Sequence, residues 1–452
     1  MQPGLAHRAQ RTRDCMRINV FASVVAFAVG AVAIAVSAEG AQEDRSASFR
    51  QIELFGDVLS RIEADYVSDT DQAELIEAAI EGMLASLDPH SAYHSPDAYE
   101  DLRVTTRGEY GGLGMEVVRR DQYITIVSPI SDTPAERAGL RTNDRIIAVD
   151  GDAIVGISVD EAVALMRGAV GDPVTITIAR EEDDPFDVTL VRDTIPLRTV
   201  ATRIESGVPY MRIAGFNERT TEMVHEGLTE LRDEFGTDLP GLIIDMRYNP
   251  GGLLDQAIGV TDVFLDGGEV VSTRTRDPRD TQRYNARPGD RLNNAPIIIL
   301  INEGTASAAE IVAGALQDRE RAVLVGMTSF GKGSIQTIIP LRGGRDGALR
   351  LTTGRYYTPA GRSIQATGII PDQQISAWAL STDDEAEAPQ IGSEADLDGA
   401  LVNENGDERE STDIAAVEQP PVDWAEDEDY QLHRAVELLN AAMETQQASL
   451  QP

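Results

Sequence analysis

The stretch Ile297-Ile-Ile-Leu-Ile-Asn-Glu-Gly-Thr-Ala-Ser307-Ala-Ala-Glu310 leads from an apolar run straight into small residues. The apolar run predicts a buried strand, and residues 308–316 repeat apolar side chains at helical spacing. Ser307 is therefore expected at a strand-to-helix junction, with the first N–H groups of the helix beside its hydroxyl. A nucleophilic serine is commonly presented in this way. The same pattern also fits a simple helix cap at Ser307, closed by Glu310 three residues later.

A lone lysine, Lys332, lies between two glycines and leads into a strand-like run. A lysine with little room to reach water loses affinity for its proton, so its amine could act as a general base beside a serine. Side chains two residues apart in a strand point the same way. Gln336 is therefore expected on the side of Lys332, where it could orient the amine.

Residues 326–332 also fit the first seven positions of the phosphate-binding pattern G-x-x-x-x-G-K-[ST]. Position 333 is glycine, however, so the hydroxyl that would ligate magnesium is missing. Residues 335–339 favour a strand where that motif requires a helix. A phosphate-binding enzyme therefore stands only as a competing hypothesis.

Strand-like and helix-like segments alternate from residue 208 to about residue 340, which predicts an α/β core. Within it, Asn249-Pro-Gly-Gly252 follows a buried strand and precedes a helix. The N–H groups of Gly251 and Gly252, together with that of Ala308, could form an oxyanion hole for a tetrahedral intermediate. The glycines would equally suit a tight turn, and both interpretations can hold.

Residues 103–190 have a pattern of their own, made of five ordered segments: residues 108–114, Tyr123-Ile-Thr-Ile-Val127, Pro134-Ala-Glu-Arg-Ala-Gly-Leu140, Asp144-Arg-Ile-Ile-Ala-Val-Asp-Gly151 and Val174-Thr-Ile-Thr-Ile178. This ordered set resembles a PDZ domain, a small β-rich barrel-like fold. The resemblance implies a carboxylate-binding loop at Gly112, Leu113, Gly114 and Met115, whose backbone N–H groups would hold a peptide carboxylate while the peptide adds as a strand.

Together these segments resemble the carboxyl-terminal processing peptidases, also called tail-specific proteases. Ser307, Lys332 and Gln336 fall on that family's catalytic positions, and the resemblance covers residues 50–380. Four further motifs carry it: Ser86-Leu-Asp-Pro-His-Ser91, Gly111-Gly-Leu-Gly-Met115, Asp245-Met-Arg-Tyr-Asn-Pro-Gly-Gly252 and Tyr356-Tyr-Thr-Pro-Ala-Gly-Arg362.

The resemblance implies a serine endopeptidase with a Ser/Lys dyad assisted by Gln, whose PDZ domain captures free C-terminal tails of proteins. It further implies that Arg167, at the end of the PDZ helix, links PDZ occupancy to the protease. The N-terminal helices would help to form a homodimer, and an activating or adaptor protein could act on the enzyme. The alternative from another class is a PDZ adaptor that binds tails and cuts nothing.

Composition limits the partners. The 452-residue chain is long enough for two or more domains, and its formal charge of −37 argues against nucleic acid, which is bound by Lys and Arg. A single cysteine, Cys15, excludes an intramolecular disulfide. His90 and His94 could face one metal on a helix, but neighbouring prolines interrupt such a helix. We therefore expect neither a metal nor a cofactor.

The two ends of the chain are unlike the middle. Four arginines within residues 7–17 precede the apolar residues 18–38, so residues 1–45 are expected to be an export signal or a membrane anchor. This pattern places the rest of the chain outside the cytoplasm, as in the periplasm. Residues 381–429 hold eighteen acidic side chains against one arginine and are expected to be disordered.

The expected fold is therefore a multidomain α/β protein. It comprises a helical N-terminal region over residues 46–102, an inserted PDZ domain over 103–190 and an α/β protease core over 191–380. The acidic segment, residues 381–429, would then lead to a C-terminal helix over residues 430–452.

Overall fold

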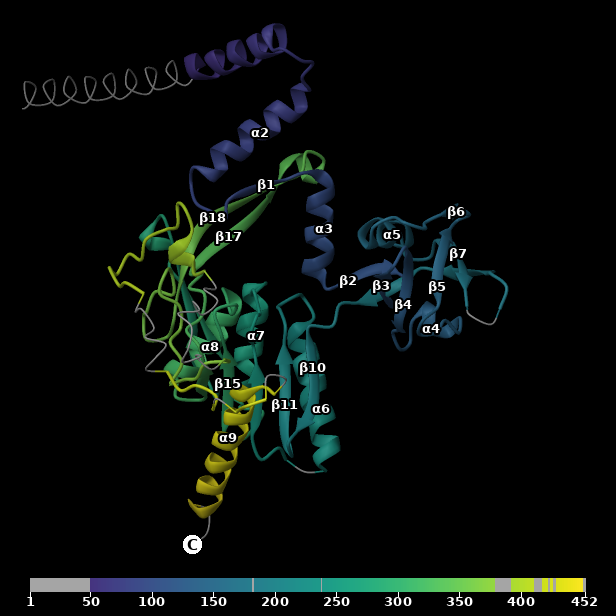
Figure 1. The fold of residues 1–452 in the computed structure, drawn as a ribbon. Helices are drawn as coiled ribbons and strands as arrows, with labels where there is room; N and C mark the ends of the chain where they lie inside the picture. Colours follow the sequence, from purple (N-terminus) through teal and green to yellow (C-terminus); the bar gives the residue numbers. More distant parts are fainter. Residues whose placement is uncertain are drawn as a thin grey trace, which may run out of the picture. The chain divides into compact units, whose positions relative to one another are not determined.

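The computed structural model describes residues 49–180, 183–236, 238–378, 392–409, 417–421, 423–425 and 428–449 (Figure 1). The chain divides into two units, residues 1–82 and 83–452. The predicted export segment, residues 1–45, lies outside the described residues. Within the described part of the chain, no helix combines the length and the apolar character needed to cross a membrane.

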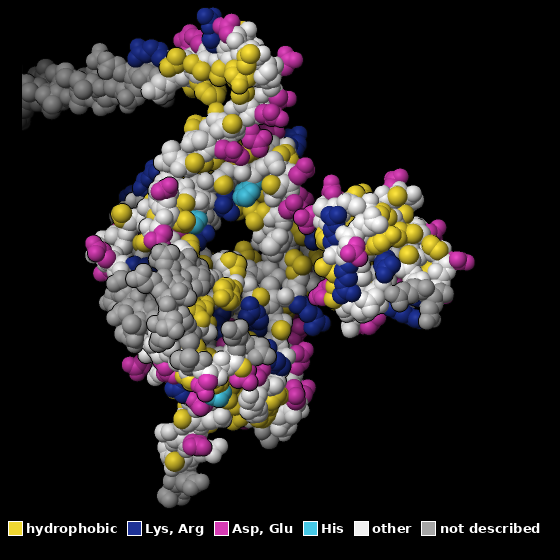
Figure 2. Space-filling view, in the orientation of Figure 1, with side chains coloured by type: hydrophobic (Ala, Val, Ile, Leu, Met, Phe, Trp, Pro, Cys, Tyr) yellow, Lys and Arg dark blue, Asp and Glu magenta, His cyan; other side chains and the backbone are white. Residues whose placement is uncertain are grey.

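The N-terminal unit is helical, as predicted. A helix over residues 49–65 precedes α2 (Gln72–Ala85). The large apolar side chains of this unit are open to solvent, and Figure 2 shows them as yellow atoms on the surface of the helices. They include Phe49, Ile52, Leu54, Phe55, Val58, Ile62, Tyr66 and Val67. This part of the chain therefore builds no hydrophobic core of its own.

The second unit is organised around a six-stranded sheet of order β10-β11-β12-β15-β16-β19. Its first pair is antiparallel and the remaining pairs are parallel. The central strands are almost continuously apolar, as expected for a parallel sheet that is covered on both faces. The strands are β10 (Val200–Glu205), β11 (Val208–Ile213), β12 (Leu242–Asp245), β15 (Ile297–Ile301), β16 (Val323–Gly326) and β19 (Gln373–Gln374).

Helices cover both faces of this sheet. Alternate side chains of β15 point to opposite faces: Ile297, Ile299 and Ile301 join one core cluster, whereas Ile298 and Leu300 join the other. The first cluster packs against α6 (Thr220–Phe235), α7 (Leu254–Phe264) and α8 (Ala308–Asp318), and the second against α9 (Tyr430–Ser449). The C-terminal helix thus covers the face of the sheet opposite to α8.

A second sheet, in the order β1-β18-β13-β14, also pairs β17 with β18. The strand after Lys332 and the strand that follows the Ser86–Ser91 motif both pair with β18, which lies between them. Its strands are β1 (Ala92–His94), β13 (Gly268–Thr275), β14 (Gln282–Ala286), β17 (Ser334–Pro340) and β18 (Ala348–Tyr357), with short 3-10 turns η1 (Pro278–Asp280) and η2 (Leu341–Gly344).

The PDZ-like module has its own six-stranded antiparallel sheet, of order β3-β4-β5-β7-β8 with β6 on β5. Its apolar strand residues form a separate core cluster. After α3 (Pro96–Arg107), the chain enters through β2 (Glu109–Gly112) and leaves through β9 (Asp193–Pro196), which pair with each other. The module comprises β3 (Met115–Arg120), β4 (Tyr123–Pro129), α4 (Pro134–Arg137), β5 (Arg145–Val149), β6 (Asp152–Ala153), α5 (Val159–Met166), β7 (Pro173–Ala179) and β8 (Phe186–Val191).

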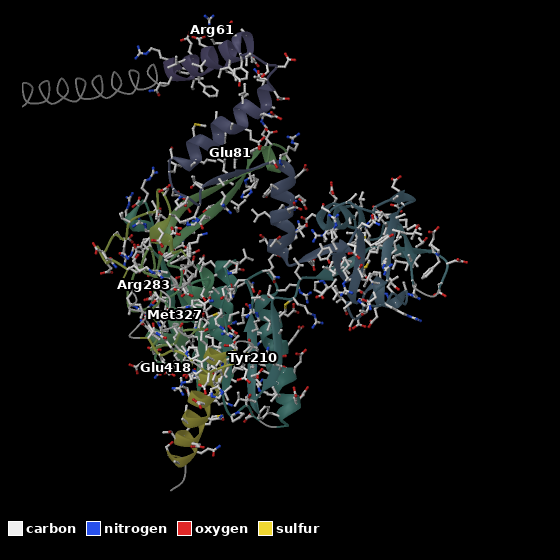
Figure 3. The ribbon with its side chains drawn as sticks, in the orientation of Figure 1. Arg61, Glu81, Tyr210, Arg283, Met327 and Glu418 are labelled. Carbon is white, nitrogen blue, oxygen red and sulfur yellow. The ribbon has the colours of Figure 1, made fainter. Side chains whose placement is uncertain are left out.

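The prediction of disorder for residues 381–429 is wrong for residues 392–409 and 417–421. Glu394 is fully buried in the short turn η3 (Glu394–Asp396), and Asn403 is also buried. Glu418, labelled in Figure 3, accepts hydrogen bonds from Tyr430 and Arg434 of α9. These polar side chains find partners on distant segments, and such long-range pairing overrides an acidic local composition.

Candidate active site

Ser307 lies between β15 and α8, at the junction that the sequence predicts. Its φ of 54° falls in the left-handed region, which disfavours a side chain, and the residue is 8% exposed. The preceding loop is fixed from within, because the Asn302 N–H donates to Thr305 Oγ1 and this hydroxyl donates to the Met246 carbonyl. Backbone strain held by a rigid surround is typical of functional positions.

Glu310, on the first turn of α8, joins the turn at Ser307, which we call the serine turn, to residues 327–333, which contain Lys332 and which we call the lysine loop. Its carboxylate accepts hydrogen bonds from the backbone N–H groups of Ser307 at 2.7 Å, Gly331 at 2.7 Å and Lys332 at 2.8 Å. The Ser329 hydroxyl donates to it as well. Burial raises the pKa of Glu310 to about 7, although these hydrogen bonds act in the opposite direction.

From its spacing to Ser307, Glu310 was expected only as the partner in a helix cap. That contact to Ser307 exists, but it is one of four. The spacing Ser-x-x-Glu was the available signal, and it cannot reveal contacts to a loop twenty residues further along the chain.

Lys332 lies in the loop between β16 and β17, before the strand begins at Ser334. A Cβ at Gly333 would come within 2.3 Å of the Gln365 backbone nitrogen, so a side chain is excluded there. The phosphate-binding hypothesis is therefore wrong for this loop. It lacks the required hydroxyl, and β17 occupies the place of the required helix.

The surroundings of Lys332 favour its neutral form. Burial, and secondly the positive charge of Arg350, lower the pKa of the Lys332 amine. The carboxylates of Glu394, Glu310 and Asp88 oppose this shift. The hydrogen bonds found among the described residues do not include one between the Ser307 hydroxyl and the Lys332 amine.

Gln336 lies on β17 on the same side as Ser334. Its amide nitrogen donates to Ser334 Oγ at 2.9 Å and to Thr352 Oγ1 at 3.2 Å. Thr352 in turn donates to Asp88 Oδ1, in the Ser86–Ser91 motif. The predicted direct contact to the Lys332 amine is not made in this structure. Gln336 instead belongs to a chain of hydrogen bonds that runs through Thr352 to the buried carboxylate of Asp88.

The Asn249–Gly252 loop packs directly against the serine turn. A Cβ at Gly251 would lie 2.8 Å from Ser307 Cβ and 2.9 Å from the Ala308 nitrogen. The Gly251 N–H already donates to Asn249 Oδ1 at 2.9 Å. Neither the Gly252 N–H nor the Ala308 N–H has an acceptor among the described residues. Of the three predicted oxyanion donors, these two are the ones available here.

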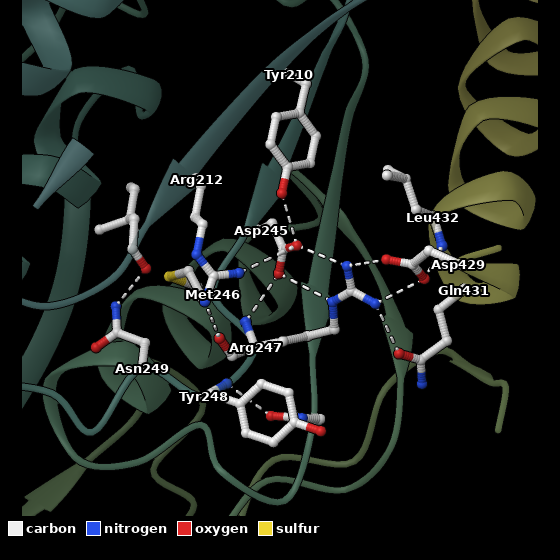
Figure 4. A network of polar contacts seen from close by, with 12 residues as sticks. Tyr210, Arg212, Asp245, Met246, Arg247, Tyr248, Asn249, Asp429, Gln431 and Leu432 are labelled. Carbon is white, nitrogen blue, oxygen red and sulfur yellow. Dashed lines mark hydrogen bonds and ion pairs between the residues drawn. The ribbon is translucent and has the colours of Figure 1, made fainter. Parts of the chain in front are cut away.

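The strand that leads into this loop is anchored to the C-terminal helix through Arg247 (Figure 4). Its guanidinium pairs with Asp245 at 2.7 Å and Asp429 at 2.6 Å, and it donates to Gln431 at 3.0 Å. Burial acts to lower the pKa of Arg247, but the hydrogen bonds to Asp429 and Asp245 raise it above its ordinary value. Arg247 therefore stays charged and connects α9 to the end of β12.

The predicted carboxylate loop lies between β2 and β3. Gly114 has a φ of 77°, and a Cβ there would lie 2.2 Å from Thr133 Cβ, so glycine is required. The Leu113 carbonyl accepts from the Ala135 N–H at 2.8 Å. Because the two groups of one peptide plane point in opposite directions, the Gly114 N–H points away from Ala135. Gly112 and Met115 flank this turn as the end of β2 and the start of β3.

Arg167 lies just after α5, and its guanidinium stacks 4.5 Å above the ring of Tyr110. Tyr110 is on β2, the strand through which the chain enters the PDZ-like module. The predicted link residue therefore touches the connecting strand pair.

The two histidines considered as metal ligands have different environments. His90 Nε2 lies 2.7 Å from Glu394 Oε2, whereas His94 Nε2 is buried on β1 and has no hydrogen-bond partner in the described part of the chain. The described residues contain no cluster of three or more His, Cys, Asp or Glu side chains placed to hold a metal.

Comparison with known proteins identifies the same segments. Residues 207–375 match the model of peptidase family S41, and residues 125–180 match that of the PDZ domain. Residues 24–98 match the N-terminal domain of the activating protease CtpB.

Named relatives cover most of the chain. A carboxy-terminal-processing protease of Bartonella bacilliformis is 46% identical over 394 residues, covering 87% of this chain and 89% of the relative. Carboxy-terminal processing protease CtpA of Bacillus subtilis is 33% identical over 362 residues, 78% of this chain and 76% of its own. A carboxyl-terminal-processing protease of Synechocystis is 38% identical over 313 residues, which cover 67% of this chain and 71% of the relative. The chain therefore belongs to peptidase family S41, among the carboxy-terminal processing serine proteases that carry a PDZ domain.

Proposed function

We propose that Ser307 is the nucleophile and Lys332 the general base of this protease. One observation carries the assignment: Glu310 holds the backbone of both residues with a single buried carboxylate. This contact joins the backbone of a strained serine to that of a lysine whose pKa is lowered by burial. A serine paired with an amine whose pKa is lowered is a competent acyl-transfer pair.

The reaction begins when the neutral Lys332 amine takes the Ser307 proton as Oγ attacks the scissile carbonyl carbon. The N–H groups of Ala308 and Gly252 stabilise the oxyanion, and Gly251 can join them if its N–H leaves Asn249. Lys332 then gives its proton to the leaving amine, the C–N bond breaks, and an acyl-enzyme remains. Water attacks the ester with Lys332 again as base, which releases the new carboxyl terminus and restores Ser307.

The substrates in this proposal are proteins with accessible C-terminal tails. The Gly114 N–H, which has no acceptor among the residues that the structure describes, and the extended strand β3 after it suit a terminal carboxylate and a peptide that adds as a strand. The contact between Arg167 and Tyr110 would couple peptide binding at this loop to the connecting strands β2 and β9. Gln336 supports the base through Thr352 and Asp88 instead of touching it.

The proposal also places the enzyme outside the cytoplasm, as a periplasmic or membrane-anchored protein. Arginines before the apolar residues 18–38 support export with or without cleavage. Proteolysis of intact cells and of spheroplasts would test this, since only spheroplasts should expose a periplasmic enzyme.

The open apolar face of residues 49–67 supports a homodimer through the N-terminal helices, because such a face is costly in water. Sedimentation of the soluble chain should show a dimer, and a Phe55→Asp, Val58→Asp variant should be monomeric. An activating protein that binds this region is the second partner we propose, and it would compete with the dimer.

An unfolded protein with a free tail tests the proposed function. The soluble enzyme should cleave it, whereas Ser307→Ala should bind the tail and leave it intact. The comparisons give a non-catalytic adaptor no support, but uncut substrate with the unaltered enzyme would restore that alternative.

A further inference from the structure

Residues 392–409, which we call the strap, bind the lysine loop at both of their ends. Near the start of the strap, the Glu394 N–H donates to the Phe330 carbonyl at 3.0 Å. At its end, the Arg409 guanidinium donates to the carbonyls of Ser329 at 2.8 Å and Phe330 at 3.2 Å. Two distant points of the strap thus hold the same short segment, two residues before Lys332.

The strap also reaches the residue after Lys332. The buried Glu394 carboxylate accepts from Gln365 Nε2 at 2.8 Å, and Gln365 Oε1 accepts the Gly333 N–H at 3.1 Å. The Asn403 amide adds a bond to the Gln365 carbonyl at 3.0 Å. The other carboxylate oxygen of Glu394 lies 2.7 Å from His90 Nε2. The lysine loop is therefore held on both sides of the amine by one segment.

Position and charge act together here. Four charged groups surround Lys332: Arg350 from β18, Glu310 from α8, Asp88 from the loop before β1 and Glu394 from the strap. Arg350 lowers the pKa of the lysine, as burial does, whereas the three carboxylates raise it. The strap thus contributes a charge as well as a mechanical support.

We propose that the strap positions the general base, with Glu394 and Arg409 as its positioning residues. Arg409 fixes the backbone before Lys332. Glu394 fixes the backbone before Lys332 directly and the backbone after it through Gln365, and its negative charge adds to the electrostatic field at the Lys332 amine. The inference rests on the assignment of Lys332 as base and adds a function for the acidic region. A purely structural role for the strap, or a role as a cover that obstructs the site, are the other outcomes of the test.

The first test compares Glu394→Gln with Glu408→Gln, an exposed acidic residue of the same strap. Hydrolysis of a small acyl ester, which needs no tail capture, is measured as kcat/KM against pH. Glu394→Gln keeps the shape but removes a negative charge that favours the ammonium form. The midpoint of the acidic limb should therefore move down by about half a pH unit or more, and Glu408→Gln should not move it. An unchanged midpoint in Glu394→Gln overturns its role.

The second test compares Arg409→Gln with Arg345→Gln, an exposed arginine directly after η2. Loss of the backbone contacts should lower kcat for the ester roughly tenfold or more, with little change in KM. Arg409→Lys should recover part of the loss. Faster hydrolysis by Arg409→Gln would show that the strap obstructs the site and would overturn the inference.

Hydrogen exchange separates this inference from the proposed function. In a Ser307→Ala background, which needs no activity, Arg409→Gln should speed exchange of the Gly331 and Lys332 amides, and Arg345→Gln should not. If the unaltered enzyme fails to hydrolyse the ester, the proposed function fails while the exchange result still decides whether the strap holds the loop. Unchanged exchange with unchanged kcat contradicts the inference, and thermal melting confirms that each variant is folded.

Discussion

The backbone N–H groups of Ser307 and Lys332 donate to one atom, Oε2 of Glu310, at 2.7 and 2.8 Å. The two residues come from separate loops, and no other described side chain binds the backbone of both. A single buried carboxylate therefore joins the backbone at Ser307 to the backbone at Lys332.

Glu310 should make stability depend on pH. Its pKa is about 7 in the folded chain against 4.5 for an unperturbed glutamate, so the folded protein holds a proton that the unfolded chain releases. This contribution to the free energy of unfolding is complete below pH 4.5 and is lost as the pH rises through 7. Urea unfolding from pH 5 to pH 8 should show the loss.

Glu310→Gln should lack that pH dependence, and its overall stability should be lower by about 1–3 kcal/mol because an amide NH₂ faces groups that are themselves donors. The control is Glu320→Gln, at an exposed position after α8. A parallel pH dependence in Glu310→Gln and the unaltered protein would refute this role.

Ester hydrolysis should increase from acidic to mildly alkaline pH. The base acts as the neutral amine, and burial lowers the pKa of Lys332 below its ordinary value of 10.5, so the active fraction grows as protons leave. The measurement is kcat/KM across pH for the unaltered enzyme and Lys332→Arg. Arginine keeps the charge but stays protonated, so this variant should be inactive at every pH. Activity in Lys332→Arg with the same pH profile would remove Lys332 from the mechanism.

Gln336→Ala should be milder than loss of Lys332, because Gln336 reaches the amine only through Thr352 and Asp88. We expect kcat to fall about tenfold, within the range of an orienting contact, with KM for the ester unchanged. Thr337→Ala, on the solvent side of the same strand, is the matched control. A loss as complete as that of Lys332→Ala would mean that Gln336 touches the base directly during turnover.

The sequence was sufficient where the pattern is local. The strand, the serine junction and the following helix rest on periodicity and small residues within some twenty residues, and the structure has them where predicted. The PDZ domain was expected from the resemblance of five ordered segments, and the match of residues 125–180 confirms it. Gly333 also argued correctly against a phosphate-binding site, because the missing hydroxyl can be seen from the single position after Lys332.

The parts that failed depend on contacts between distant segments. The prediction of disorder used the average composition of residues 381–429, which is strongly acidic. An average cannot show that Glu394 is buried, because its partners His90 and Gln365 come from other regions of the chain. The contacts of Glu310 were missed for the same reason, since three of its four donors, from Ser329, Gly331 and Lys332, lie on the lysine loop. Only the structure reduces the three candidate oxyanion donors to Gly252 and Ala308. Nothing in the sequence shows that the Gly251 N–H donates to the side chain of Asn249.

Tail capture should depend on Gly114. A valine there would need a φ near 77° and would overlap Thr133, so the loop could no longer present its N–H groups to a carboxylate. Gly114→Val should weaken cleavage of a tailed peptide much more than hydrolysis of the small ester, and amidation of the peptide terminus should have the same effect on the unaltered enzyme. Gly156→Val tests for a general effect, since it is a glycine of the same module with positive φ and open space around it. Equal cleavage of amidated and free peptides would remove carboxylate recognition.

Acylation of Ser307 with the help of Lys332 is tested most directly by mass spectrometry of the enzyme mixed briefly with a small acyl ester. The unaltered enzyme should carry one added acyl group, on the peptide that contains Ser307. Ser307→Ala and Lys332→Ala should each show none, and the double variant should be no worse than either, because the pair acts as a unit. Acylation at another residue, or full acylation of Ser307 in Lys332→Ala, would rule out this Ser/Lys mechanism.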